Sequence, residues 1–213
     1  MLKTQEQNRS LPWSKQPPLK KTQTLVTVAG LEHKVGATHL ALSLALKASK
    51  RSLATGIILS PESFDALAQY YVISVREESC GQGKKVKRFA SFAGLSIMSG
   101  VLPGDLEGFD LLVWDCGLLP HAHRRFASGD LCCLVSGGQP WELEPLSILL
   151  MNLSYAELEQ YVICLRGARE TDFEHIRSQM AGKVPCISIM HKPEWSEVEL
   201  REDLTLILRL AGF

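Results

Sequence analysis

The sequence predicts an α/β fold in which a mostly parallel β-sheet carries helices on both faces. Short apolar runs alternate along the chain with longer segments of helical periodicity, as in strand–helix–strand units. Several of these runs lack polar alternation, which is typical of strands buried on both faces. The chain has 213 residues, which is enough for one sizeable domain and short for two.

The first predicted unit is a strand, a glycine-containing loop and a helix. Residues 22–29 are mostly apolar and predict a buried strand, and residues 30–36 form the loop. Residues 37–50 predict a helix whose leucines recur at helical spacing, with alanines that permit close packing on a sheet. Lys47 and Lys50 suit the C-terminus of this helix.

The same alternation continues to the end of the chain. Pro61 at the first turn of a helix and Gly137 after an apolar run are typical boundary signals. The expected elements are strands at 54–59, 86–92, 95–98, 109–115, 131–136, 160–165 and 184–189, helices at 61–71, 141–153, 171–180 and 197–210, a surface loop at 74–88, a connection at 102–107 and a turn at Pro120.

Composition argues against several classes of protein. Lys and Arg total 23 and balance 23 Asp and Glu, so the bulk charge gives no strong nucleic-acid signal. No apolar run approaches the roughly 18–20 residues of a membrane span, and the N-terminus has no apolar core of a secretory signal. Six scattered cysteines without a CxxC pair favour reduced core thiols of a cytoplasmic protein over a zinc site.

Residues 1–21 are polar, mildly basic and contain prolines, which predicts a flexible N-terminal tail. The alternative is a docking arm with Trp13 as its anchor, flanked by Leu11 and Pro12. The expected organisation is therefore this tail followed by a single domain at 22–213.

Residues 24–50 have the layout of a phosphate-binding loop. Such a loop needs glycines, a helix N-terminus, a lysine for the outer phosphates and a Ser or Thr for magnesium. Gly36 stands at the last glycine and Thr38 at the magnesium hydroxyl, whereas Ala37 stands where the lysine belongs. The alternative is an ordinary strand-to-helix turn that needs Gly36 only for its backbone shape.

The segment TVAGLEHKVGATHLALSLA resembles the ParA/MinD-like P-loop ATPases, whose deviant Walker A motif reads roughly KGGVGKTT before a helix rich in Leu and Ala. Val35, Gly36 and Thr38 match that motif. Ala37 falls at the invariant lysine and Glu32 at the family's additional lysine. The remaining differences are His33 and Lys34 at the two glycines and His39 at the second threonine.

Two further stretches carry this resemblance. GIILSPE lies where the family's second strand ends in Asp-x-Asp-Pro, so Glu62 would keep one acid and Ser60 would replace the other. FDLLVWDCG resembles the family strand whose acid holds the water shell of magnesium, which places Asp115 in that role. A strand-ending acid that caps the next turn is the alternative for Asp115.

The resemblance implies a P-loop NTPase architecture over roughly residues 22–213 and a nucleotide site on the loop. ATP and magnesium are the implied cofactors, and Thr38 and Asp115 would hold the metal when nucleotide binds. No catalytic residue is assigned. The implied nucleotide-binding residues are Gly30, Lys34, Val35, Gly36, Ala37, Thr38 and His39.

Charge at the loop decides between the possible functions. Losing both family lysines removes two charge-assisted contacts of roughly 1.5–3 kcal/mol each, and Glu32 adds repulsion. The sequence therefore favours a degenerate ParA/MinD-like protein that binds a partner, either another protein or a second copy, as a pseudo-ATPase or a regulatory or assembly subunit. An active ATPase that uses Lys34 and Thr38 with Asp115 is the alternative. A Rossmann-like dinucleotide binder is the weakest reading, because the loop lacks GxGxxG.

Three other features have a structural reading beside the functional one. His121 and His123 at alternating positions suggest a metal pair, but no third ligand is evident, and a solvated loop or switch segment is the alternative. Trp141 is expected to pack in the core, with a base pocket or partner surface as the alternative. The last helix is acidic in its first half, unlike the basic face of a membrane-targeting helix.

Overall fold

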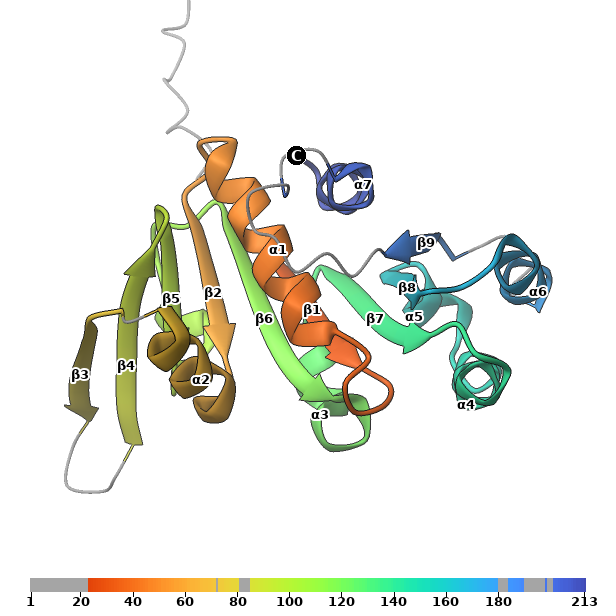
Figure 1. Cartoon of the computed structure of the whole chain (residues 1–213), viewed down its shortest axis with the longest axis horizontal. Coiled ribbons are helices and arrows are strands. Elements are labelled where there is room, and N and C mark those ends of the chain that lie inside the picture. Colours follow the sequence, from red (N-terminus) through yellow and green to blue (C-terminus); the bar gives the residue numbers. More distant parts are fainter. Residues whose placement is uncertain (1–22, 72, 81–84, 180–183, 190–197, 199–200) are drawn as a thin grey trace, which may run out of the picture.

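The computed structural model describes residues 23–71, 73–80, 85–179, 184–189, 198 and 201–213. The expected N-terminal tail at 1–21 lies outside these residues. Within them, nine strands form one sheet in the order β3-β4-β5-β2-β6-β1-β7-β8-β9 (Figure 1). The strands are β1 (Thr24–Gly30), β2 (Thr55–Leu59), β3 (Val75–Cys80), β4 (Lys85–Phe92), β5 (Leu95–Ser99), β6 (Leu111–Leu118), β7 (Leu131–Gly137), β8 (Tyr161–Arg166) and β9 (Cys186–Ile189).

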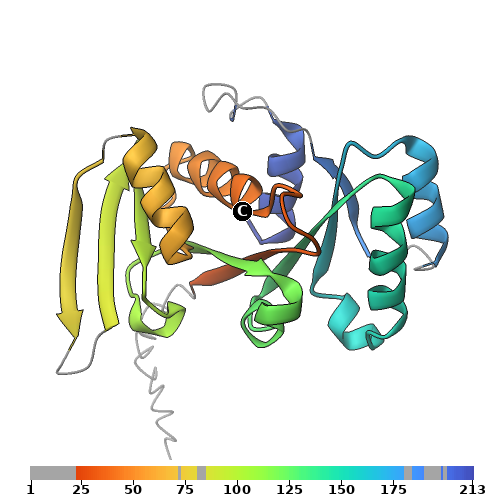
Figure 2. The same cartoon turned by 60° about the horizontal axis from the view of Figure 1, so that its bottom comes forward.

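Helices cover both faces of this sheet, as the sequence predicted. The helices are α1 (Ala37–Lys50), α2 (Pro61–Tyr71), α3 (Leu119–Phe126), α4 (Pro140–Met151), α5 (Tyr155–Leu158), α6 (Glu170–Gln179) and α7 (Glu202–Leu210), with a 3₁₀ turn η1 (Pro103–Asp105). One apolar core joins α1, α2 and α7 to the sheet, and a second joins α3, α4, α5 and α6 to the other face. Figure 2 shows α1 and α2 on one side of the sheet and α3 on the opposite side.

The centre of the sheet is parallel and buried. β1 lies between β6 and β7 and pairs with both in parallel. Its core-facing residues Val26 and Val28 have no exposed surface. Because parallel strands carry their connections at the same edge, the loops after β1, β6 and β8 gather at one edge of the sheet.

The predicted surface loop at 74–88 is wrong. β3 pairs antiparallel with β4, and β4 pairs antiparallel with β5, so the sheet gains a ribbon at one edge. Much of this ribbon faces water and is held by charged pairs, such as Arg88 with Glu77 at 3.3 Å. The described side chains of β3 are exposed, so β3 lacks the apolar pattern by which strands are recognised in a sequence, whereas β4 agrees with the strand predicted at 86–92.

The predicted turn at Pro120 is also wrong, because α3 begins at Leu119. Pro120 occupies the first helical turn, where its missing N–H costs no hydrogen bond. β6 likewise continues to Leu118, beyond the predicted end at Asp115. Other boundaries lie within a few residues of expectation, and the short helix α5 was not predicted.

Lys47 lies in the last turn of α1, as the sequence predicted. Its side chain is buried, and Nζ donates hydrogen bonds to the carbonyls of Val198 and Arg201. The Arg201 guanidinium in turn donates to the Ser43 hydroxyl of α1 at 3.4 Å and pairs with Asp203 of α7. This buried polar cluster fastens α7 to α1.

Candidate functional site

The loop between β1 and α1 lies at the carboxyl edge of the central strand. The Leu31 N–H donates to the Val135 carbonyl of β7 at 2.8 Å, so the start of the loop is tied to the sheet. Lys34 has φ 62° and Gly36 has φ 99°, both in the left-handed region. Gly36 then begins α1, since its carbonyl accepts the Leu40 N–H at 2.9 Å. Glycine is required at this position, whereas Lys34 holds a conformation that non-glycine residues seldom adopt.

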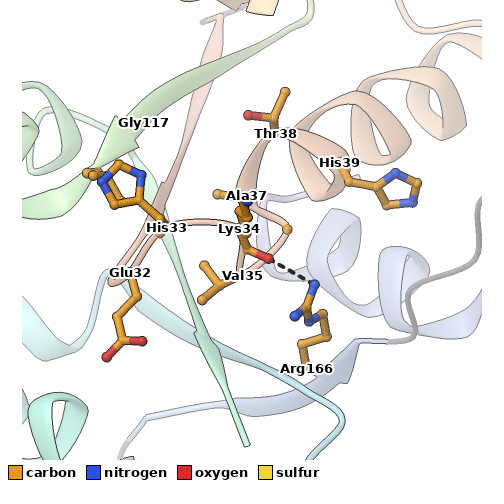
Figure 3. Close-up of a pocket in the computed structure, with 12 residues that line it drawn as sticks. Glu32, His33, Lys34, Val35, Ala37, Thr38, His39, Gly117 and Arg166 are labelled. Atoms are coloured by element: carbon orange, nitrogen blue, oxygen red, sulfur yellow. Dashed lines mark hydrogen bonds between the residues drawn. The ribbon is translucent and has the colours of Figure 1, made fainter. Parts of the chain in front are cut away.

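A cavity of about 470 Å³ lies against this loop (Figure 3). The cavity brings together all seven residues that the sequence assigned to nucleotide binding, from Gly30 to His39. Gly117 and Leu118 reach it from the end of β6, and Arg166 reaches it from the end of β8. The complete lining is Gly30, Glu32, His33, Lys34, Val35, Gly36, Ala37, Thr38, His39, Gly117, Leu118 and Arg166.

Thr38 and Asp115, the two expected metal ligands, are in direct contact. The Thr38 hydroxyl donates to Asp115 Oδ2 at 2.6 Å, and the Gly117 N–H donates to Oδ1 at 3.1 Å. The Gly117 bond is the turn-capping contact that was the alternative reading of Asp115. The turn-capping reading of Asp115 therefore agrees with this contact, and the magnesium role of Thr38 and Asp115 stays a prediction.

Burial dominates the electrostatics of Asp115. The residue is 4% exposed, and desolvation raises the pKa of its carboxyl, against the opposing hydrogen bonds from Thr38 and Gly117. The neighbouring thiol is inert for a related reason, because burial, followed by the charge of Asp115, raises the pKa of Cys116 to about 12. Cys116 is therefore protonated at neutral pH and is not a nucleophile.

Two cationic side chains are found among the residues that line the cavity. Lys34 is exposed at the tip of the loop. Arg166 is half-buried, and its Nη1 donates to the Lys34 carbonyl at 3.0 Å (Figure 3). Ala37, at the first position of α1, has a methyl side chain, so it offers a phosphate its backbone N–H but no charge.

Sequence reasoning missed Arg166. The predicted strand ended one residue earlier, and an arginine in a connection carries no motif. The available signal was topological, because a charged residue at the carboxyl end of a parallel strand faces the edge where ligands bind in open α/β sheets. Only the packing of β8 beside β7 brings Arg166 to a loop that is 132 residues away in the chain.

Other residues singled out in the sequence lie away from the cavity. Glu62 is exposed in the first turn of α2, and the Ser60 hydroxyl accepts the Ser63 N–H at 3.1 Å as a helix cap. His121 and His123 are exposed on α3 rather than in a loop. Among the residues that the structure describes, no cluster of three or more His, Cys, Asp or Glu side chains is arranged to hold a metal ion.

Trp141 does not pack in the core as expected. It is 70% exposed on α4, and the same helix exposes Ile148 and Met151 at 56% and 70%. Trp141 is not one of the cavity-lining residues. Of the readings open for this residue, neither core packing nor a base pocket agrees with its position.

Comparison with known proteins identifies the fold. No family model matches the chain, and no curated protein matches it by sequence. Solved structures do match over nearly the whole chain. The MinC:MinD cell division complex of Aquifex aeolicus aligns at 10% identity and TM-score 0.62, covering 89% of this chain and 96% of that one.

Two nucleotide-bound structures match at similar coverage. The septum site-determining protein MinD of Pyrococcus horikoshii, complexed with Mg-ADP, aligns at 16% identity and TM-score 0.55, covering 89% of this chain and 95% of that one. A putative plasmid partition protein of Borrelia burgdorferi, bound to AMPPNP, aligns at 12% identity and TM-score 0.54, covering 90% and 98%. The predicted architecture is thus confirmed: this chain has the α/β P-loop fold of the MinD and plasmid partition proteins.

Proposed function

We propose that this protein binds a partner through a MinD/ParA-type domain and does not hydrolyse ATP. The observation that carries the proposal is Ala37 at the first position of α1. In phosphoryl transfer a fixed cation at the phosphates neutralises charge in the transition state. Removing one such preorganised group costs roughly 10²–10³-fold in rate, so a loop without it is a poor catalyst.

The two charged residues of the loop itself, Lys34 and Glu32, do not restore this cation at the first turn of α1. Lys34 is exposed and belongs to the loop rather than to the helix. Glu32 lines the same cavity and adds a negative charge that repels phosphate. The geometry therefore favours a site that keeps the loop and the helix N-terminus of a phosphate-binding loop but lacks the lysine at residue 37.

Nucleotide binding without turnover is compatible with what remains. The related folds named above hold Mg-ADP and AMPPNP. In this chain the Thr38 hydroxyl and the Asp115 carboxylate would hold magnesium, whose charge would offset that of the phosphates. The two side chains are already in contact, so their positions fit such an ion.

The exposed face of α4 supports the partner-binding half of the proposal. Trp141, Ile148 and Met151 are spaced seven and three residues apart and therefore share one side of the helix. Apolar residues on the opposite side, such as Leu146, already fill the core. Aromatic and methionine side chains are enriched at the centres of protein interfaces.

Charge indicates the chemistry of that partner. Glu144 is exposed on the same helix, between Trp141 and Ile148. We therefore expect an apolar protein surface that carries a basic side chain opposite Glu144.

The cysteines support a reducing compartment such as the cytoplasm. The free thiols are those of Cys116, Cys132, Cys133, Cys164 and Cys186. No helix in the described ranges has both the length and the apolar character to cross a membrane.

An ATP turnover assay on the purified full chain tests the catalytic half. We expect no magnesium-dependent hydrolysis by the wild-type protein. Ala37→Lys is the matched variant, because it returns the cation to the first turn of α1 and should tighten ATP binding about 10-fold or more. Wild-type turnover that Thr38→Ala abolishes would overturn the proposal.

Affinity capture tests the partner half. Trp141→Glu should lose specific partners that the wild-type chain retains. Leu102→Glu is the control, because Leu102 is 58% exposed and lies in a different part of the fold. If both variants capture the same proteins as the wild type, α4 is not the partner surface.

An active ATPase is the second candidate. The 2.6 Å contact between Thr38 and Asp115 favours it, because these are the residues that a magnesium nucleotide needs. On this reading Lys34 would supply the cation from the loop. Lys34→Gln would then abolish turnover, whereas the pseudo-ATPase proposal predicts no turnover to abolish.

A further inference from the structure

We infer that Arg166, at the end of β8, is the cation that binds a phosphate-bearing ligand in the loop cavity. The inference rests on the proposed function for the location of the site. It goes further by naming a residue outside the loop and the chemical group that this residue recognises. The ligand would enter the cavity with its phosphate directed to the β8 side of the loop.

The backbone of Arg166 is held firmly at the carboxyl edge of the sheet. Arg166 is in register with Gly137 of β7 and with Ile189 of β9. Its carbonyl accepts the Gly138 N–H at 3.0 Å. A side chain on so well-fixed a backbone is positioned more precisely than one on a loop tip such as Lys34.

The side chain crosses from β8 to the start of α1. A Cβ atom built on Gly36 would lie 3.8 Å from Cδ and 4.0 Å from Nη1 of Arg166. Figure 3 shows the guanidinium beside the loop, between Val35 and His39. Because Gly36 precedes the first residue of α1, the guanidinium lies next to the N–H groups at the N-terminus of that helix.

Arg166 differs in its contacts from the four arginines that form salt bridges in the described residues. Within the described part of the chain, its guanidinium bonds the Lys34 carbonyl and makes no salt bridge. A guanidinium has five N–H donors, so one carbonyl leaves capacity for a further acceptor. By contrast, carboxylates pair with Arg76, Arg88, Arg169 and Arg201.

The surroundings favour an anion as that acceptor. Lys34 and Arg166 outnumber Glu32 among the charged residues that line the cavity. The N-terminus of α1 adds the positive end of its dipole. A planar guanidinium matches the oxygens of a phosphate group in a bidentate contact. The 470 Å³ volume is in the range of small-molecule sites, so the phosphate can belong to a larger ligand.

Calorimetric titration of the full chain tests this inference, with inorganic pyrophosphate, ADP and adenosine as separate probes. We expect pyrophosphate and ADP to bind the wild-type protein and to bind Arg166→Gln about 10-fold or more weakly. Arg166→Lys should keep part of the affinity, because it keeps the charge but loses the bidentate geometry. Arg76→Gln is the matched control, since it removes one positive charge at β3, the far edge of the sheet.

Three results would overturn the inference. One is the absence of pyrophosphate and ADP binding to the wild-type chain at millimolar concentration. Another is equal phosphate affinity of the wild-type chain and Arg166→Gln, with thermal unfolding showing that the variant is folded. The third is a loss of adenosine binding as large as the loss of pyrophosphate binding, which would mean that Arg166 stacks on a base. Wild-type ATP turnover would overturn the proposed function and leave Arg166 in this role.

Discussion

The hydroxyl of Thr38 and the carboxylate of Asp115 are joined by a hydrogen bond of 2.6 Å. Thr38 lies in the first turn of α1 and Asp115 within β6, 77 residues apart in the chain. The pairing of β1 with β6 sets Val28 beside Asp115 and brings the start of α1 over the carboxylate. This contact joins residues of the first helix turn and of a central strand at one edge of the sheet.

Asp115→Asn should make the protein more stable at neutral pH. Burial raises the pKa of Asp115 in the folded state above its ordinary value. Between the unfolded and the folded pKa the folded state binds more protons, so the stability of the wild-type protein falls as pH rises through that window. An amide has no charge to desolvate and keeps an acceptor for the Gly117 N–H. Urea unfolding over a pH series should show a gain at pH 7 that vanishes below the ordinary pKa of Asp.

Thr38→Val should lower stability at pH 7 by about 1–3 kcal/mol, because it leaves a buried carboxylate without one of its donors. Thr38→Ser keeps the hydroxyl and is the control. The valine variant should also raise the pKa of Asp115 further, so its penalty should shrink in acid. Chemical denaturation at pH 7 and pH 4 measures both effects. A penalty that is the same at both pH values would count against the role of the carboxylate.

Lys47→Ala should cost about 2–4 kcal/mol, because it leaves the carbonyls of Val198 and Arg201 without their buried donor and opens a gap between α1 and α7. Lys50→Ala, at the exposed end of the same helix, should change stability by less than about 1 kcal/mol. Hydrogen exchange should show the loss of protection concentrated in α7. An equal loss of unfolding free energy in the two variants would contradict the role of Lys47 in holding α7 against α1.

Gly36→Ala should cost about 1–2 kcal/mol, because residue 36 has φ 99°. The added methyl group meets no close neighbour, since the nearest atom is Cδ of Arg166 at 3.8 Å, so the cost is in the backbone. Gly104→Ala is the control, because its Cβ meets nothing within 4 Å and its φ is not in the left-handed region. Thermal unfolding measures both. The Gly36 variant should also bind pyrophosphate more weakly than the Gly104 variant.

The buried strands and the helix α1 could be predicted from the sequence. β1, β2, β6, β7 and β8 are mostly apolar, and α1 carries leucines and alanines at helical spacing. These patterns report burial directly, because strands enclosed on both faces and helices with one apolar side leave a periodic signature. Segments exposed to water on both sides, such as β3, leave no such signature, and β3 was missed.

The sequence by itself determined the strand–loop–helix plan, the places of Gly36 and Thr38 at the start of the helix and of Asp115 on a central strand, and the absence of a lysine at residue 37. Only the tertiary structure decided three further facts. Arg166 contacts this loop, the buried Lys47 side chain bonds the segment that leads into α7, and Trp141 is exposed. The physical reason is that a motif reports contacts between residues close in the chain. Contacts made across neighbouring strands depend on strand order and helix packing, which local sequence patterns do not specify.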